Sequence, residues 1–420
     1  MRVFFTNLGC KLNQAEVDAQ ARRFIAAGHS LAPQLEQADL HVINSCTVTH
    51  LAARDSRKIA RRGQRLAAGM RTVLTGCYAT AEAQEAADLD GVDLVVTNDR
   101  KDQLLELVHE AFPESLPEQD ALPIPYVPIQ FGRARALVKV EDGCNMRCAF
   151  CIIPSTRGRQ RSRTVDEVVD EVAALSDGGY PEIVVTGVQI SEYADGGRRL
   201  YDLVAALLEH TTAPRLRLTS IAPWKFDDRL LELWTDERLC RHIHMSLQSG
   251  STATLKRMRR PYSAASYAAL ADRLREAIPG LALTTDVIVG FPGETRKEFD
   301  ESLAFVEQMA FARPHIFTYS SRAGTEAAGL PDQVAPAEKK TRVAEMLAVA
   351  RNSDRSFRQR HLGATAEVVW EERKAGRWRG LSDNYIRVLT DTEQDLAGTL
   401  SQVELIGLSE HGMEGRPVMA

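Results

Sequence analysis

Apolar, β-branched runs alternate with helix-like stretches along the first hundred residues. The runs cover residues 2–8, 39–45, 71–76 and 92–98. The helix-like stretches cover 13–27, 50–68 and 79–87, and another follows Asp99. Strands that alternate with helices predict parallel β-α-β units whose sheet is covered on both faces. We therefore expect residues 1–112 to form an open parallel α/β domain.

A proline-rich segment, 113–130, comes next and predicts a linker, because proline neither continues a helix nor joins a central strand. The alternation of strands and helices then returns over residues 131–355. Six strand-like runs favour a partial (β/α)6 barrel, since a complete barrel needs eight strands. These runs cover 136–141, 182–187, 217–220, 242–248, 283–290 and 314–320.

The last sixty residues show a third pattern. A helical run at 335–360 is followed by short strand-like pieces separated by turns, which predict a small β-barrel over 360–420. Trp378, Tyr385 and several arginines of this barrel are candidates for stacking on, and pairing with, unpaired nucleotides. A core position explains Trp378 equally well.

Composition and charge limit the classes of function. The chain has 420 residues, 44% hydrophobic and 26% charged, which is typical of a globular protein. No run approaches the ~18 apolar residues of a membrane span, so we expect a cytoplasmic protein without a membrane partner. The formal net charge of -5 excludes nucleic-acid binding through bulk positive charge and leaves only local basic patches.

One such basic patch lies on the helix-like stretch 50–68. Its cations, which recur at spacings of three and four residues, include Arg57, Lys58 and Arg61. A stripe of this kind suits a phosphate backbone, and an ordinary solvated helix face is the alternative. Two further basic groups lie within 157–163 and 256–260.

Three cysteines, Cys144, Cys148 and Cys151, fall within eight residues after the first strand of the middle segment. A structural zinc site would add a second, distant cysteine pair of similar compactness, which this chain lacks. Thiolates are the usual ligands of 4Fe–4S clusters, and three of them leave one iron open for a cofactor or substrate. Buried packing thiols, the alternative, have no reason to repeat at this spacing.

A second set, Cys10, Cys46 and Cys77, is widely spaced in sequence. Each of these cysteines follows the carboxyl end of one of the first three predicted strands. Ligands gather at that edge in open α/β sheets, so the three thiols are expected to converge. Three unrelated small hydrophobic residues are the alternative. Cys240 belongs to neither set and is expected to be a buried core thiol.

The Cys-x3-Cys-x2-Cys spacing, with Phe150 before the last cysteine, resembles the radical S-adenosylmethionine enzymes. The resemblance implies that Cys144, Cys148 and Cys151 hold a 4Fe–4S cluster whose open iron binds S-adenosylmethionine, which is then split into methionine and a 5'-deoxyadenosyl radical. Gly187 lies where many members carry Gly-Gly-Glu, so the grip on the methionine moiety is left open. Gly187, Gln248 and Ser249 are candidates for contacting the cofactor or substrate. For Gln248 and Ser249, loop hydrogen bonding is the equal alternative.

The segments 7–14, 44–49 and 75–77 are similar to the amino-terminal domain of the methylthiotransferases, a radical enzyme family with an auxiliary 4Fe–4S cluster. Segments 244–251, 289–295 and 319–325 resemble further motifs of that family, although Met245 and Ser246 replace an expected Leu-Pro. The likeness covers almost the whole chain and includes a TRAM-like RNA-binding barrel at 360–420. It implies that Cys10, Cys46 and Cys77 hold the auxiliary cluster.

The residues after Cys10 and Cys46 are most like the branch that modifies N6-threonylcarbamoyladenosine beside the tRNA anticodon. This resemblance predicts a radical tRNA methylthiotransferase that uses S-adenosylmethionine and two 4Fe–4S clusters. The expected partners are tRNA, a low-potential electron donor such as flavodoxin or ferredoxin, and a sulfur donor. The alternatives are the same chemistry on N6-isopentenyladenosine or on a ribosomal-protein aspartate, and a non-catalytic iron–sulfur redox sensor that binds RNA.

Overall fold

The computed structural model describes residues 1–66, 69–115 and 134–418. The described residues fall into two compact units. The first contains residues 1–115, 142–146 and 152–160, and the second contains 134–141, 147–151 and 161–418. Residues 116–130 of the expected linker lie outside the described residues, and Pro113–Ser115 form a short 3-10 helix, η3.

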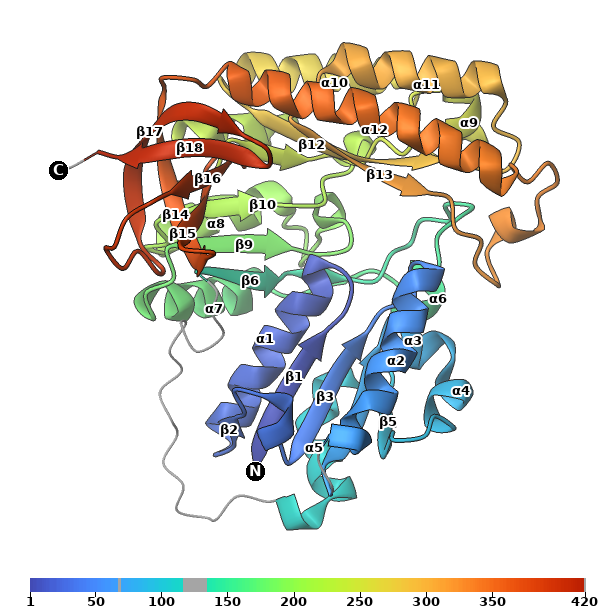
Figure 1. Cartoon of the computed structure of the whole chain (residues 1–420), viewed down its shortest axis with the longest axis vertical. Helices are drawn as coiled ribbons and strands as arrows, with labels where there is room; N and C mark the ends of the chain where they lie inside the picture. Colours follow the sequence, from blue (N-terminus) through green and yellow to red (C-terminus); the bar gives the residue numbers. More distant parts are fainter. Residues whose placement is uncertain (67–68, 116–133, 419–420) are drawn as a thin grey trace. The chain divides into compact units, whose positions relative to one another are not determined.

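The first unit is built on a parallel five-stranded sheet of order β2-β1-β3-β4-β5 (Figure 1). The strands are β1 (Arg2–Asn7), β2 (Ser30–Leu31), β3 (Leu40–Ser45), β4 (Arg71–Gly76) and β5 (Leu94–Val96). The helices are α1 (Lys11–Ala26), α2 (His50–Leu66), α3 (Cys77–Ala81), α4 (Ala83–Ala87) and α5 (Leu104–Ala111), with 3-10 turns η1 (Leu35–Gln37) and η2 (Lys101–Gln103). The predicted parallel α/β architecture is confirmed; the two-residue edge strand β2 was not predicted.

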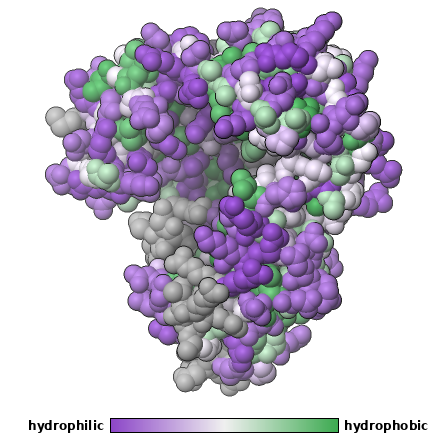
Figure 2. Space-filling model, turned by 45° about the vertical axis from the view of Figure 1, so that its right-hand side comes forward, coloured by the Kyte–Doolittle hydropathy of each residue, from purple (hydrophilic) through white to green (hydrophobic). Residues whose placement is uncertain are grey.

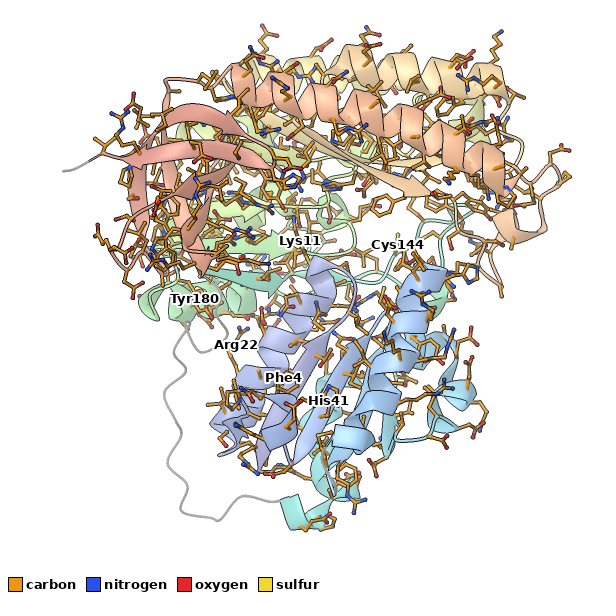
Figure 3. The ribbon with its side chains drawn as sticks, in the orientation of Figure 1. Phe4, Lys11, Arg22, His41, Cys144 and Tyr180 are labelled. Atoms are coloured by element: carbon orange, nitrogen blue, oxygen red, sulfur yellow. The ribbon has the colours of Figure 1, made fainter. Side chains whose placement is uncertain are left out.

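Helices cover both faces of this sheet. Val42 and Val73 belong to one apolar cluster, together with residues of α1 and α5. Their chain neighbours Ile43 and Leu74 belong to a second cluster, with residues of α2, α3 and α4. Successive side chains of a strand point to opposite faces, so a strand buried on both faces must be a continuous apolar run. Figure 3 labels Phe4 and His41 on the neighbouring strands β1 and β3, where their ring centroids lie 5.8 Å apart.

The second unit contains the predicted partial barrel as two parallel three-stranded sheets of order β10-β9-β6 and β11-β12-β13. Single parallel bridges, Leu216 to Leu239 and Ile221 to Met245, continue the pairing between the sheets. The strands are β6 (Arg135–Lys139), β9 (Glu182–Thr186), β10 (Leu216–Leu218), β11 (His242–His244), β12 (Ala282–Val289) and β13 (Arg313–Thr318). Pro314 is tolerated because β13 is an edge strand.

The helices of the middle segment begin at recognisable sequence signals. Thr164, Ser263 and Thr295 each form a capping box at the start of α7, α10 and α11. The helices are α6 (Ile153–Arg157), α7 (Val165–Asp177), α8 (Leu200–His210), α9 (Thr252–Arg257), α10 (Ala264–Ala277), α11 (Arg296–Met309) and α12 (Pro336–Gln359). Short elements are β7 (Glu141–Asp142), β8 (Arg161–Ser162), η5 (Ile190–Glu192), η6 (Pro223–Lys225), η7 (Asp228–Thr235) and η8 (Glu326–Gly329).

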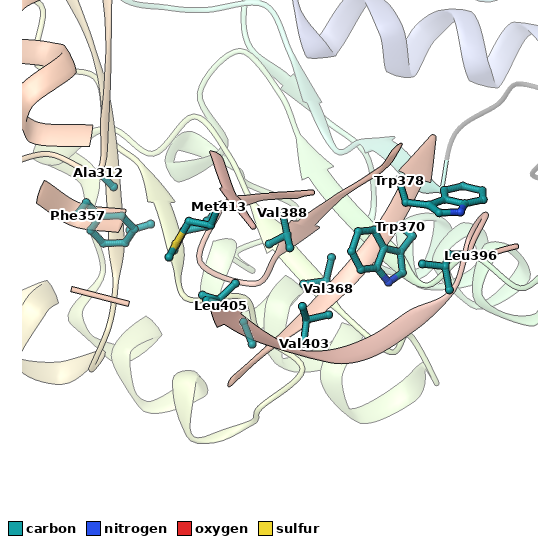
Figure 4. Packing of buried hydrophobic residues seen from close by; sticks show 13 residues of the cluster. Ala312, Phe357, Val368, Trp370, Trp378, Val388, Leu396, Val403, Leu405 and Met413 are labelled. Carbon is teal, nitrogen blue, oxygen red and sulfur yellow. The ribbon is translucent and has the colours of Figure 1, made fainter. Parts of the chain in front are cut away.

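A closed five-stranded barrel of order β14-β15-β16-β18-β17 ends the chain. Its strands are β14 (Thr365–Lys374), β15 (Arg377–Ser382), β16 (Arg387–Thr390), β17 (Leu400–Ser409) and β18 (Gly412–Pro417). Strand β18, with two glycines and a proline, was not predicted because these residues are rare in strands. Apolar side chains such as Trp370, Val403 and Met413 fill the interior (Figure 4).

The packing of the barrel core distinguishes the two interpretations of Trp378, a nucleotide-stacking ring and a core residue. Its side chain is 6% exposed and belongs to the same apolar cluster, so it is a core residue and does not offer a face to a nucleotide. The ring of Tyr385 stacks on His242 with centroids 4.1 Å apart, and the guanidinium of Arg217 lies 5.3 Å from its centroid. One face of Tyr385 is therefore already used inside the protein.

A buried ionic cluster fastens this barrel to the central sheet. Glu182 on β9 is fully buried and pairs with Arg215 and Arg217 of β10 and its approach, each at 2.7 Å. Arg217 also donates to the backbone carbonyls of Ser382 and Asp383 at the end of β15, at 3.0 and 2.7 Å. Burial alone would raise the pKa of Glu182, but the two arginines outweigh it and lower the pKa to about 2.

On the face shown in Figure 2, hydrophilic residues predominate and hydrophobic ones are scattered. Among the described residues, no helix combines the length and apolarity needed to cross a membrane.

Glu182→Gln should destabilise the second unit by about 3 kcal/mol, because it leaves two buried arginines without their counter-charge. Urea unfolding measures the change. Asp166→Asn, which removes an exposed partner of Arg198, is the matched control and should leave unfolding unchanged. Equal effects of the two substitutions would contradict the importance of burial.

The effect of Glu182 should also depend on pH. The pKa of Glu182 in the folded state, about 2, lies below the ordinary glutamate value near 4.3. The stabilisation by the ionised carboxylate is therefore complete above the ordinary pKa and is lost as the pH falls through the folded-state pKa. The difference between wild type and Glu182→Gln should be constant from pH 7 to about 5 and shrink below about pH 4.

Candidate functional site

The first unit brings Cys10, Cys46 and Cys77 to one edge of its sheet. Strands β1, β3 and β4 are adjacent and aligned, with Asn7 opposite Asn44 and Ser45 opposite Gly76. The three cysteines therefore leave neighbouring strands at the same edge, as the sequence predicted. A Cβ atom built on Gly9 would lie 2.9 Å from the Cys46 sulfur, so the first two cysteine loops touch.

Close backbone packing in these loops depends on glycine. Gly9 and Gly76 have φ of +105° and +97°, a region that L side chains rarely adopt. At Gly76 a Cβ would lie 2.4 Å from the carbonyl oxygen of Ser45 and equally close to the side-chain oxygen of Asn44. Side chains larger than hydrogen would push the loop of Cys77 away from its neighbour.

Side-chain amides hold the cysteine loops, and one of them directs a donor at a sulfur atom. Asn13 donates to the carbonyls of Leu8 and Ser45, at 2.7 and 3.1 Å, and so joins the first two loops. The side-chain amide of Asn98 lies 3.8 Å from the Cys77 sulfur in donor geometry. Donors directed at sulfur suit thiolate ligands, because such hydrogen bonds stabilise the negative charge and tune a cluster.

Burial suppresses the reactivity of the Cys46 thiol. Burial raises the pKa of Cys46 to about 11, so the thiol stays protonated at neutral pH until a metal displaces the proton. Among the described residues, no group of three or more His, Cys, Asp or Glu side chains could hold a single metal ion. In a 4Fe–4S cube each cysteine binds a different iron, so the sulfurs need not meet at one point.

Beside these loops lies a buried ionic network centred on Arg157. Its guanidinium contacts Glu16 at 2.8 Å, Asp142 at 2.9 Å and the side-chain oxygen of Asn13 at 2.5 Å. Lys101 completes the network through an ion pair of 2.7 Å with Glu16. All four charged residues are buried, and two cations balance two anions. The sequence grouped Arg157 with surface cations; that assignment is wrong.

The network links the loop of Cys144 to the loops of Cys10 and Cys46. Asp142, which pairs with Arg157, accepts the backbone N–H of Gly143 at 2.8 Å, one residue before Cys144. The N–H of Cys144 donates to the carbonyl of Gly158 at 3.1 Å. Figure 3 labels Cys144 in this segment. No local sequence signal marks the network, because Glu16 and Arg157 are separated by 141 residues.

Cys148 and Cys151 belong to the second unit. The N–H of Cys151 donates to the carbonyl of Cys148 at 3.0 Å, which folds the motif into a turn. Arg260 directs a guanidinium nitrogen at the Cys148 sulfur from 3.2 Å. The same guanidinium lies 4.4 Å from the centroid of Trp224, whose ring stacks on Tyr262. The sulfur of Cys148 therefore has a charged donor, which suits a thiolate ligand.

The three arginines of the basic group at 256–260 are engaged, and only Lys256 of that group is left exposed without an ion pair among the described residues. Arg257 pairs with Glu298 at 2.7 Å and Arg259 with Glu326 at 2.8 Å, while Arg260 faces Cys148. On α2, Lys58 and Arg61 are exposed. Arg57 is partly buried, 3.6 Å from Glu85 and stacked over Tyr78. Only part of the predicted stripe is therefore available to a ligand.

The residues predicted to contact the cofactor have structural roles in their own loops. A Cβ on Gly187 would lie 2.6 Å from a carboxylate oxygen of Glu141, so this glycine makes room for that side chain. Gln248 has φ of +68° and bridges to Val287 through its backbone. Ser249 is fully buried and accepts the N–H of Ser251 at 3.2 Å. A contact of Gly187, Gln248 or Ser249 with the cofactor stays a prediction. Cys240 is 1% exposed, as expected of a core thiol.

Two family models match the chain. Residues 138–306 match the radical SAM superfamily, and residues 2–97 match the uncharacterized protein family UPF0004. A threonylcarbamoyladenosine tRNA methylthiotransferase of Bacillus subtilis is 35% identical over 96% of this chain and 93% of its own length. A tRNA-2-methylthio-N(6)-dimethylallyladenosine synthase of Methylacidiphilum infernorum is 30% identical over 100% of this chain and 95% of its own length.

Solved structures support the fold. The radical S-adenosylmethionine methyltransferase TsrM of Kitasatospora setae, whose structure was solved with cobalamin and a [4Fe-4S] cluster, superposes with a TM-score of 0.57. It covers 78% of this chain and 77% of its own length, at 14% sequence identity.

The family match over residues 138–306 and the full-length relatives identify the chain as a radical S-adenosylmethionine enzyme. The chain belongs to the methylthiotransferase family of these enzymes, as its full-length similarity to named members shows. S-adenosylmethionine and 4Fe–4S clusters are the cofactors of this family, as the sequence predicted. Membership of an enzyme family overturns the alternative of a non-catalytic redox sensor.

Arg157→Met should destabilise the first unit by about 3 kcal/mol, because Glu16 and Asp142 lose their shared buried partner. The iron held by Cys10, Cys46 and Cys77 should fall with it. Thermal melting and iron content after anaerobic reconstitution measure the two effects. Arg159→Met, an exposed residue of the same loop, is the control. Identical behaviour of both variants would show that the network does not support the cysteine loops.

Proposed function

We propose that this protein is a tRNA methylthiotransferase that acts on the adenine ring of N6-threonylcarbamoyladenosine next to the anticodon. The relative from Bacillus subtilis, 35% identical over 96% of the chain, carries the proposal. Three further relatives with the same name are 32–34% identical. Relatives named for dimethylallyladenosine reach 30–34%, so modification of N6-isopentenyladenosine is the second candidate.

We infer different tasks for the two cysteine sets. Cys144, Cys148 and Cys151 hold the cluster that works with S-adenosylmethionine, and Cys10, Cys46 and Cys77 hold the auxiliary cluster. When bound, the first cluster and its cofactor supply a radical strong enough to take a hydrogen atom from a carbon. Arg260 brings a positive charge to Cys148, and Asn98 offers a neutral hydrogen-bond donor to Cys77.

One reaction needs both cysteine sets, and hydrogen bonds within the chain connect a loop of one set to loops of the other. A hydrogen on an adenine carbon is replaced by a methylthio group, so the sulfur donor must wait within bonding distance of the activated carbon. The Arg157 network ties the loop of Cys144 to the loops of Cys10 and Cys46 by direct hydrogen bonds. This tie is the structural support for coupling the two centres.

The partners follow from this reaction. Besides tRNA, the enzyme needs a low-potential electron donor such as flavodoxin or ferredoxin and a source of sulfur. A tRNA substrate places the protein in the cytoplasm. The exposed cations Lys58 and Arg61 on α2, with a smaller share from Arg57, are proposed to contact the RNA backbone.

Replacing Cys144, Cys148 and Cys151 together by Ala should leave about half of the roughly eight irons expected from two 4Fe–4S clusters. It should also abolish formation of 5'-deoxyadenosine, because that product needs the cofactor-binding cluster. Iron analysis and chromatography of the reaction measure both. Cys240→Ala, a core thiol outside both sets, is the control and should retain all iron.

The complementary variant replaces Cys10, Cys46 and Cys77 by Ala. It should lose the other half of the iron and all methylthio transfer, while some cleavage of S-adenosylmethionine persists. Cleavage by the first variant, or methylthio transfer by the second, would refute the division of tasks.

Mass spectrometry of tRNA nucleosides from cells with and without the gene identifies the substrate. Deletion should remove the methylthio derivative of N6-threonylcarbamoyladenosine and restore the unmodified nucleoside, leaving the isopentenyladenosine series unchanged. Loss of the isopentenyladenosine derivative would favour the second candidate. An unchanged tRNA profile, with a mass loss on a ribosomal protein, would favour the protein substrate.

A further inference from the structure

A large cavity in the second unit lies outside the cysteine loops. Its volume is about 780 Å³, and it is bounded by the carboxyl-terminal half of α12, the starts of β12 and β13, and the strands β16 to β18 of the barrel. Thr284 and Arg313 line it near the amino-terminal ends of β12 and β13. The loops expected to carry the cofactor follow the opposite, carboxyl ends of such strands.

The lining is strongly basic in a chain with a net charge of -5. Five arginines contribute to it, and they come from three parts of the fold. These are Arg313, Arg351, Arg355, Arg358 and Arg387. The acidic residues of the lining are Asp354 and Glu410, and Asp354 already pairs with Arg358 at 2.7 Å.

Four of these arginines are exposed and form no ion pair with any carboxylate of the described residues. They are Arg313, Arg351, Arg355 and Arg387. Several other arginines of this unit are paired, among them Arg296 with Glu345 on α12 and Arg257 with Glu298. Arg351 and Arg355 are four residues apart on one helix, where like charges repel and destabilise it. Folding alone does not explain this arrangement.

The floor of the cavity has unsatisfied polar atoms. Arg358 is 7% exposed, and its terminal nitrogens donate to the carbonyls of Ser409 and Gly412 and to Asp354. Its Nε and the hydroxyl of Ser409 are buried without a hydrogen-bond partner among the described residues.

We propose that this cavity binds phosphate groups of the tRNA backbone, at a point remote from the nucleoside that is modified. The inference rests on the proposed tRNA substrate. Arginine is suited to phosphate because its planar fork donates two parallel hydrogen bonds. Four unpaired arginines spread over α12, β13 and β16 match a chain of phosphates better than a single anion.

The position of the cavity explains why a macromolecule is its ligand. Thr284 lines the cavity, and the loop at the carboxyl end of β12 begins at Gly290. Six residues of extended strand separate them by roughly 20 Å. A small substrate cannot reach both places, whereas a folded RNA can. The cavity would thus hold the body of the tRNA while one nucleoside enters the catalytic edge.

The test is the salt dependence of tRNA binding to the reconstituted holoenzyme. Arg351→Gln with Arg355→Gln removes two unpaired charges from the cavity. The matched control, Lys340→Gln with Arg360→Gln, removes two charges from exposed positions on or adjoining the same helix that do not line it. Each lost phosphate contact should lower the log–log salt slope by about 0.9, so the cavity variant should lose about 1.8 and the control nothing.

A second variant, on β16, tests whether the change in slope comes from the cavity or from a local disturbance of helix α12. Arg387→Gln should lower the slope by about 0.9. Iron content per chain verifies that each variant is folded and loaded. Equal slopes for the cavity variant, the control and the wild type would overturn the proposal while leaving the tRNA substrate in place.

Two further outcomes separate the remaining explanations. Thermal stabilisation by inorganic tripolyphosphate that needs Arg351 and Arg355, with no change in the tRNA slope, would identify a site for a small polyphosphate and overturn the RNA assignment. Failure of the wild-type holoenzyme to bind any tRNA would instead overturn the proposed function on which the inference rests.

Discussion

The alignment of parallel strands is the constraint on which the candidate site depends. Because β1, β3 and β4 run in the same direction and in register, residues that follow them meet at one edge of the sheet. Cys10, Cys46 and Cys77 are far apart in sequence and become neighbours for this reason alone. A strand shifted by one residue would also exchange its two buried faces, so both apolar clusters fix the register that the cysteines need.

Buried charges serve the protein in two separate places. Arg157 holds cysteine-bearing loops of the first unit together, and Glu182 fastens the carboxyl-terminal barrel to the central sheet of the second. Neither network adds much net stability, since removing each ion from water costs free energy that the ion pairs must offset. Both instead specify one arrangement, because any other would leave a charge buried without a partner. Such specificity is useful where two centres must act on one substrate.

Some arginines of this chain form ion pairs and others do not. Only the second group is available to bind a charged ligand. Sequence spacing marked three basic groups, but the structure shows that Arg157 is buried and that Arg257, Arg259 and Arg260 are engaged. The unpaired arginines of the cavity beside α12 were not marked as a group, since they come from β13, α12 and β16. The availability of a basic side chain to a ligand can therefore be assessed only when its ion pairs in the structure are known.

The sequence alone determined the alternation of strands and helices and the three architectures, and it singled out the six candidate cysteines, because periodicity, turn residues and cysteine spacing are local properties. Strand β18, the burial of Trp378 and the partners of Arg157 were decided only by the tertiary structure. Each depends on groups far away in the chain: barrel closure pairs β18 with β16 and β17, and Arg157 meets Glu16 across 141 residues. Local patterns cannot encode such pairings, since they arise only when packing brings distant segments together and burial makes an unpaired charge too costly.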